Sequence, residues 1–132
     1  MSEKHYWLTP PDVYEKLNKE FGFTFDPCPY PKPEGFNSLE IDWGISNYCN
    51  PPFRASDGGG FGPTAWVKKA IEENRQGKTI VLTIPVRYYV NLLMEAGAEY
   101  RSLGRVRWLE TKTKEPWKCP TPTGCFILRG KP

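Results

Sequence analysis

The stretch that decides the fold is Thr79-Ile80-Val81-Leu82-Thr83-Ile84, a continuous run of apolar and β-branched residues. A run of this kind is typical of a central strand that is covered on both faces. Helices that precede and follow the strand along the chain would provide that cover, as they do in α/β domains.

Helices are predicted where apolar residues recur at helical spacing. One follows Pro10, with Thr9 placed to cap its first turn and Gly22 placed to end it. Two more end at Gly77 and Gly97. The apolar stripes of the three helices cover residues 13–21, 65–71 and 89–94.

Shorter apolar runs predict further strands. Phe23-Thr24-Phe25 would deliver Asp26 to a strand end, and the run Ser46–Cys49 ends before prolines that cannot extend a ladder. Residues 39–43 are predicted as a short strand, and residues 105–109 and 125–128 as a closing antiparallel pair. The pattern predicts one domain over residues 1–132, an α/β protein with a compact Rossmann-like sheet and a C-terminal antiparallel hairpin.

The composition excludes several classes of protein. The chain carries 18 Lys and Arg against 15 Asp and Glu, a formal net charge of +3, which suits a nucleic-acid partner but not a purely electrostatic binder. No segment approaches the roughly 18 consecutive apolar residues of a membrane span, and no run of signal-peptide type follows Met1. The sequence therefore predicts a cytoplasmic protein that does not bind membranes.

The cysteines lack the spacing of a metal site. They form no Cys-x-x-Cys pair, and His5 is the one histidine that could complete a mixed site. We therefore expect reduced packing thiols and no metal. The cysteines are Cys28, Cys49, Cys119 and Cys125.

The residues that carry chemistry are Asn50-Pro51-Pro52-Phe53, directly after a predicted strand. The amide oxygen of Asn50, expected to be exposed, and the carbonyl of Pro51 can each accept a hydrogen from an amino group. Such contacts stabilise the positive charge that develops when the nitrogen attacks an electrophile. The prolines stiffen the turn, and Phe53 can stack on a base removed from a duplex. The alternative interpretation is a proline-rich turn with a packing aromatic.

Together, the motifs resemble those of the small phage and prophage DNA N6-adenine methyltransferases, a branch of the Dam-type enzymes, over almost the whole chain. The matching pieces are Trp7-Leu8-Thr9-Pro10, Phe25-Asp26-Pro27, Asn50-Pro51-Pro52-Phe53, residues 66–70, residues 80–85 and Gly104-Arg105-Val106. The resemblance implies transfer of a methyl group from S-adenosylmethionine to the N6 amine of adenine in DNA. It also implies that the protein, if phage-encoded, is located in the cytoplasm of the host cell.

The resemblance further implies the roles of individual residues. The residues expected to hold the target adenine are Asn50, Pro51, Pro52 and Phe53. Those expected near S-adenosylmethionine are Trp7, Thr9, Pro10, Asp26, Pro27 and Asn50. Larger methyltransferases carry a glycine-rich loop after the first strand, whereas this chain continues into Cys28-Pro29-Tyr30-Pro31. The cofactor pocket is therefore expected to be abbreviated, with Glu40 or Asp42 as candidates for the ribose.

Basic and aromatic residues in two loops predict the DNA surface, because phosphates and bases bind such side chains. They are Arg54, Lys112, Lys114, Trp117 and Lys118. Glycine-rich residues 57–62 are expected to close over a flipped base. The alternative for the predicted DNA surface is an ordinary solvated hairpin. The alternatives for the function are a methyltransferase acting on cytosine N4, RNA or a protein amide, and a non-catalytic nucleic-acid binding module. The sequence does not predict the oligomeric state.

Overall fold

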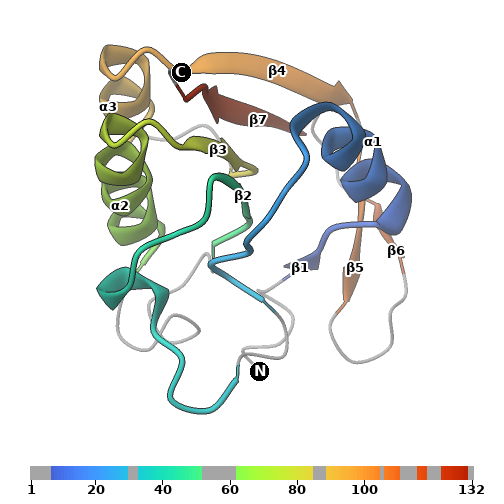
Figure 1. Cartoon of the computed structure of the whole chain (residues 1–132). Coiled ribbons are helices and arrows are strands. Elements are labelled where there is room, and N and C mark those ends of the chain that lie inside the picture. The colour runs from blue at the N-terminus through green and yellow to red at the C-terminus, as the bar shows by residue number, and fades with distance from the viewer. Residues whose placement is uncertain are drawn as a thin grey trace.

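A computed structural model describes residues 7–29, 33–51, 62–84, 89–104, 106–110, 116–118 and 123–130. They form a four-stranded sheet, a three-stranded sheet and the helices around them (Figure 1). The helical elements are α1 (Pro11–Phe21), the 3₁₀ turn η2 (Ser38–Glu40), α2 (Pro63–Arg75) and α3 (Val90–Glu95). The strands are β1 (Trp7–Leu8), β2 (Ser46–Cys49), β3 (Thr79–Leu82), β4 (Glu99–Gly104), β5 (Arg107–Glu110), β6 (Pro116–Lys118) and β7 (Thr123–Leu128).

The larger sheet has the strand order β2-β3-β7-β4. β2 and β3 are parallel, with Ser46 opposite Thr79, and β7 runs antiparallel between β3 and β4. Phe25 adds a single parallel bridge to Asn47 at the free side of β2. The C-terminal ends of these three parallel segments, at Phe25, β2 and β3, therefore lie at the same edge of the sheet. We call this edge the carboxyl edge.

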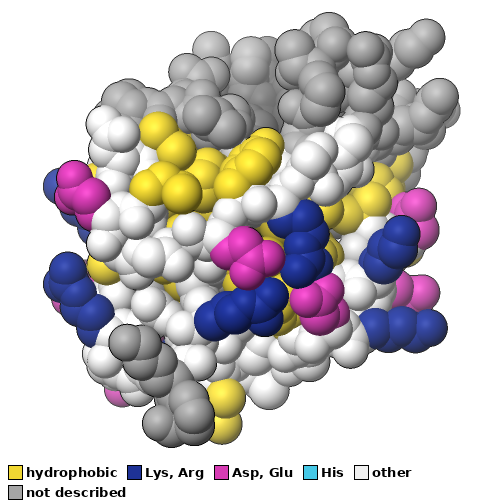
Figure 2. Space-filling model, turned by 90° about the horizontal axis from the view of Figure 1, so that it is seen from above, with side chains coloured by type: hydrophobic (Ala, Val, Ile, Leu, Met, Phe, Trp, Pro, Cys, Tyr) yellow, Lys and Arg dark blue, Asp and Glu magenta, His cyan; other side chains and the backbone are white. Residues whose placement is uncertain are grey.

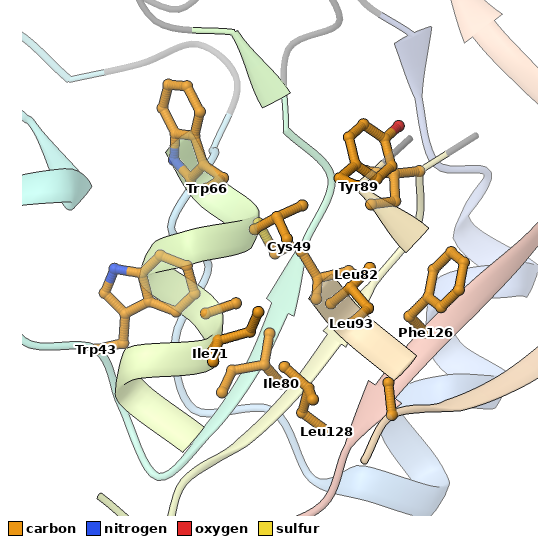
Figure 3. Packing of buried hydrophobic residues seen from close by; sticks show 14 residues of the cluster. Trp43, Cys49, Trp66, Ile71, Ile80, Leu82, Tyr89, Leu93, Phe126 and Leu128 are labelled. Atoms are coloured by element: carbon orange, nitrogen blue, oxygen red, sulfur yellow. The ribbon is translucent and has the colours of Figure 1, made fainter. Parts of the chain in front are cut away.

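Helices cover both faces of this sheet, as the central apolar run predicts (Figure 1). One face packs against α2 and α3 in a cluster that includes Ile80, Leu82 and Phe126 (Figure 3). The other face presents Tyr48 and Val81 to α1. Since successive strand residues point to opposite faces, β3 is apolar throughout because both of its faces are buried.

The first helix begins and ends where the sequence predicts, but its cap differs. Gly22 adopts a left-handed conformation with φ 59° and donates its N–H to the carbonyl of Asn18, which ends α1. The residue before the helix is Pro10, and no side chain caps the first turn. The predicted capping role of Thr9 is wrong, because its hydroxyl is hydrogen-bonded to that of Tyr48 instead.

The predicted closing hairpin is also wrong. Strands occur near both predicted positions, but β5 pairs with β1 and β6, whereas β7 pairs with β3 and β4. β4 was not predicted, because this strand lies at an edge of the sheet and exposes Glu99, Tyr100 and Ser102. An edge strand needs little apolar character, so its pattern is weak.

Two predicted short strands also differ from the structure. Residues 23–25 lie beside β2 but make one bridge, at Phe25, rather than a ladder. Residues 39–43 are not a strand. The side chain of Asn37 accepts the N–H of Leu39 and starts η2 instead. A capped turn of this kind satisfies backbone groups locally, without a neighbouring strand.

A buried carboxylate fixes the segment that follows η2. Glu73 of α2 is fully buried, and its Oε1 accepts the backbone N–H of Trp43 at 2.8 Å. Lys78 and Lys69 pair with the same carboxylate at 2.5 and 3.1 Å. Burial alone would raise the pKa of Glu73, but these hydrogen bonds outweigh it and hold the pKa below its ordinary value. Glu73 therefore connects α2 to the approach to β2.

Acidic and basic side chains alternate on the face opposite the carboxyl edge, which Figure 2 shows from above. Arg101 of β4 forms a two-pronged ion pair with Glu20 of α1, at 2.6 and 3.0 Å. Arg129 pairs with Glu99 at 3.1 Å. Because these described charges are paired, they contribute no basic excess of the kind that a DNA surface requires. None of the described helices has the length and apolar character of a membrane span.

Candidate functional site

The carboxyl edge holds the first two residues of the predicted catalytic tetrad. Asn50 and Pro51 follow β2 directly, and both are buried, Asn50 with 6% of its surface exposed. The expectation of an exposed amide is therefore wrong. Pro52 and Phe53 lie outside the described residues, as does most of the glycine-rich segment 57–62.

Asp26 lies at the same edge because Phe25 runs parallel to β2. Its position is fixed from both sides: Tyr48 donates its backbone N–H to the carbonyl of Phe25, and Cys28 donates its own to Oδ1 of Asp26 at 2.8 Å. Pro27, between them, is buried. The carboxylate is therefore held by a local turn rather than by a strand ladder.

The electrostatics of Asp26 distinguish it from an ordinary turn residue. Burial raises the pKa of its carboxyl to about 6, and the hydrogen bond from Cys28 opposes this only in part. Within the described ranges, no lysine or arginine forms an ion pair with it. Asp26 is thus a partly desolvated carboxylate, suited to a ligand that brings a cation or hydroxyl donors.

Thr9 is brought into the same region by Tyr48. The Thr9 hydroxyl is hydrogen-bonded to the Tyr48 phenol, which is also 3.0 Å from the hydroxyl of Thr83. Burial raises the pKa of Tyr48, and the negative charge of Asp26 adds to this rise. The backbone N–H of Tyr48 is bonded to the carbonyl of Phe25, the residue before Asp26. Pro10 is buried, and for Trp7 the structure describes only the backbone, in β1.

Tyr48 and Thr83 are site residues that the sequence did not reveal. The sequence pattern predicts only that Tyr48 is a buried strand residue. Its hydroxyl partners, Thr9 and Thr83, lie 39 and 35 residues away along the chain. Local patterns contain no information about such contacts.

Two thiols lie beneath this edge. Sγ of Cys28 is 3.9 Å from Sγ of the fully buried Cys49, and both cysteines are reduced, as is Cys125. Burial raises the pKa of Cys49, so it stays protonated. Cys119 lies outside the described residues. Among the residues that are described, no group of three or more potential ligands could hold a metal ion.

The ribose candidates lie on the surface. Glu40 and Asp42 are both exposed, and Glu40 lines a shallow groove of about 410 Å³ between η2 and α2 with Leu39 and Ala65. No described contact joins either carboxylate to Asp26 or Asn50. Their role stays a prediction.

The predicted DNA-binding residues are only partly described. Arg54, Lys112 and Lys114 lie outside the described residues. Trp117 and Lys118 lie on β6, opposite Trp108 and Arg107 of β5. Of the predicted DNA-binding residues, these two therefore lie in the three-stranded sheet.

The family comparison covers this entire site. A family model described as DNA N-6-adenine-methyltransferase (Dam) matches residues 1–121. No curated protein shows significant similarity to the chain. The matched range includes Thr9, Asp26, Asn50 and Pro51 and ends just before β7. The chain therefore belongs to the Dam family of DNA N-6-adenine-methyltransferases.

Proposed function

We propose that this protein transfers the methyl group of S-adenosylmethionine to the N6 amine of adenine in DNA. Family membership implies an enzyme that methylates adenine in DNA. The observation that carries the assignment of the site is the position of Asn50 and Pro51 at the carboxyl edge, next to the strand-like segment that delivers Asp26. Ligands of open α/β sheets bind at this edge.

Asn50 and Pro51 would act on the nitrogen that is methylated. The N6 lone pair is delocalised into the adenine ring, so the amine is a weak nucleophile. The amide oxygen of Asn50 and the carbonyl oxygen of Pro51 would each accept one N6 hydrogen. These contacts localise the lone pair and stabilise positive charge on the nitrogen during attack, more strongly in the transition state than in the ground state. Phe53 would stack on the flipped base.

Asp26 fits the cofactor. When bound, S-adenosylmethionine supplies a methyl group activated by a sulfonium centre. The cofactor also carries an ammonium group and ribose hydroxyls. These groups are hydrogen-bond donors that would stabilise the partly desolvated carboxylate of Asp26. Asp26 would accept hydrogen bonds from one of them, while Thr9 and Pro10 border the same region. The carboxylate that would hold the ribose is proposed to be Glu40 or Asp42.

The function is tested by following label from tritiated S-adenosylmethionine into DNA. After enzymatic digestion, we expect the label in N6-methyladenine. Matched DNA in which purine, lacking the 6-amino group, replaces adenine should accept none. Label in cytosine, RNA or protein alone would overturn the assignment to adenine, and the absence of both methyl transfer and cofactor binding would favour the non-catalytic binding module.

Replacing Asp26 by asparagine is expected to stabilise the free protein at pH 8 while weakening cofactor binding. The raised pKa means that the folded state disfavours the carboxylate, so stability falls as pH rises from the ordinary value of 3.8 to about 6. Removing the charge should return about 3 kcal/mol, or about 10 °C in Tm. S-adenosylmethionine affinity should fall about 10- to 100-fold, because a charge-assisted hydrogen bond is lost.

Thermal unfolding and calorimetry check both effects. The rise in Tm should vanish near pH 3, where wild type is also protonated, and the exposed Asp42→Asn variant should leave Tm unchanged. A destabilised Asp26→Asn protein with unchanged cofactor affinity would contradict the proposed role.

A further inference from the structure

Three hydroxyl groups from distant parts of the chain form a connected chain at the carboxyl edge. Thr9 is bonded to Tyr48, and Tyr48 is bonded to Thr83 at 3.0 Å. We call these residues the hydroxyl chain. Thr9 follows β1 of the smaller sheet, whereas Tyr48 lies on β2 and Thr83 directly follows β3 of the larger one. The hydroxyl chain therefore joins the two sheets.

The central phenol is held rigidly. The Tyr48 side chain is 3% exposed, with Tyr14 packed edge-on at 5.2 Å and Phe23 at 5.3 Å between ring centroids. Burial raises the pKa of Tyr48, more than its hydrogen bonds with Thr83 and Thr9 lower it. The phenol consequently stays neutral and can donate one hydrogen bond while accepting another.

Packing of the ring does not explain the hydroxyl group of Tyr48. A phenylalanine would fill the same space between Tyr14 and Phe23, so the aromatic contacts do not account for the hydroxyl group. The hydroxyl lies between Thr9, in the segment expected to border the cofactor, and Thr83. It also lies within the electrostatic reach of Asp26, and Tyr48 precedes Asn50 by two residues on the same strand end.

We propose that Tyr48 is a positioning residue for the cofactor site. Its phenol holds residues 7–10 in a fixed place relative to Asp26, so that both sides of the cofactor are bound at once. Tyr48 acts through Thr9 and not on the adenine, which is expected at Asn50 and Pro51. Its loss should thus weaken binding of the cofactor and leave turnover at saturation nearly unchanged. The inference rests on the proposed function.

The test compares Tyr48→Phe with Thr9→Val, Thr9→Ser and the double variant Tyr48→Phe/Thr9→Val. We expect the Kd for S-adenosylmethionine to rise about tenfold in Tyr48→Phe, as for the loss of one well-placed hydrogen bond. The kcat on DNA at saturating cofactor should stay within about twofold of wild type. Thr9→Val should match Tyr48→Phe, and the double variant should be no worse than either, because both remove the same connection. Thr9→Ser retains the hydroxyl and should bind normally.

A matched control removes a phenol hydroxyl elsewhere: Tyr100→Phe on the edge strand β4, where the side chain is 44% exposed, should leave Kd unchanged. A lower Tm in Tyr48→Phe with unchanged Kd would reduce Tyr48 to a purely structural residue and overturn the inference. Additive effects of the two substitutions would overturn it as well. If Tyr48→Phe does not fold, the comparison of Thr9→Val with Thr9→Ser makes the same test. Failure of the unmodified protein to bind S-adenosylmethionine would instead overturn the proposed function itself.

Discussion

Replacing Asn50 by alanine is expected to lower kcat for adenine methylation by about 10²- to 10³-fold, the usual cost of removing one preorganised hydrogen-bond partner of the transition state. The amide oxygen is one of the two acceptors proposed for the N6 hydrogens, and its removal leaves the developing charge on nitrogen with Pro51 alone. Single-turnover methylation at saturating cofactor and DNA measures this loss directly.

Because Asn50 is buried, its replacement should also lower Tm, so a matched control is needed. Asn47 lies on β2, just before Asn50, and is fully buried, and its side chain is hydrogen-bonded to Gly44 and to the carbonyl of Thr79. Asn47→Ala should lose comparable stability while keeping its kcat per folded molecule. If both variants lose activity only in proportion to their unfolded fraction, Asn50 has a packing role and the catalytic assignment fails.

The largest effect on stability is expected from Glu73→Ala. The substitution leaves Lys69, Lys78 and the backbone N–H of Trp43 without their shared acceptor in a site where the carboxylate is fully buried. Breaking a buried ion pair costs about 3–5 kcal/mol, which corresponds to a decrease of roughly 10 °C or more in Tm for a domain of this size. Thermal unfolding at pH 7, followed by circular dichroism, measures this decrease in Tm.

The effect of Glu73 should depend on pH in a defined direction. Its pKa in the folded protein is lowered, so its contribution is complete above the ordinary value of 4.5 and is lost as pH falls through the lowered value. Wild type and Glu73→Ala should therefore converge in Tm in strong acid. The neighbouring Glu72, whose side chain is 66% exposed, provides the control, because Glu72→Ala should change stability by less than about 0.5 kcal/mol. Equal effects of the two substitutions at pH 7 would contradict this role of Glu73.

The elements that the sequence predicted well are those whose signals are local. Residues 79–84 are apolar because both faces of β3 are covered, and Gly22 ends α1 through its own backbone conformation. The pairing of β7 could not be predicted in the same way. Its position depends on β3 and on β4, and β4 carries little apolar pattern because it lies at an edge.

In the candidate site, too, the features with local sequence signals were predicted and those that depend on distant residues were not. Strand ends placed Asn50 and Asp26 at one edge of the sheet, and the structure agrees on this placement. The burial of Asn50, the raised pKa of Asp26 and the contacts of Tyr48 arise from groups far away in the sequence. Such properties depend on packing, which residue patterns do not encode locally.

The placement of β7 also constrains the order in which the protein can assemble during synthesis. β7 is the last described strand to leave the ribosome, yet it fills the position between β3 and β4. Until residues 123–128 have emerged, β3 has an unpaired edge on that side, and β4 has no neighbour in the sheet. Unpaired edges of this kind are sites where nascent chains associate wrongly. The sheet that holds Asn50 can thus be completed only after translation of β7, so a ribosome-bound chain halted before Thr123 should bind no cofactor.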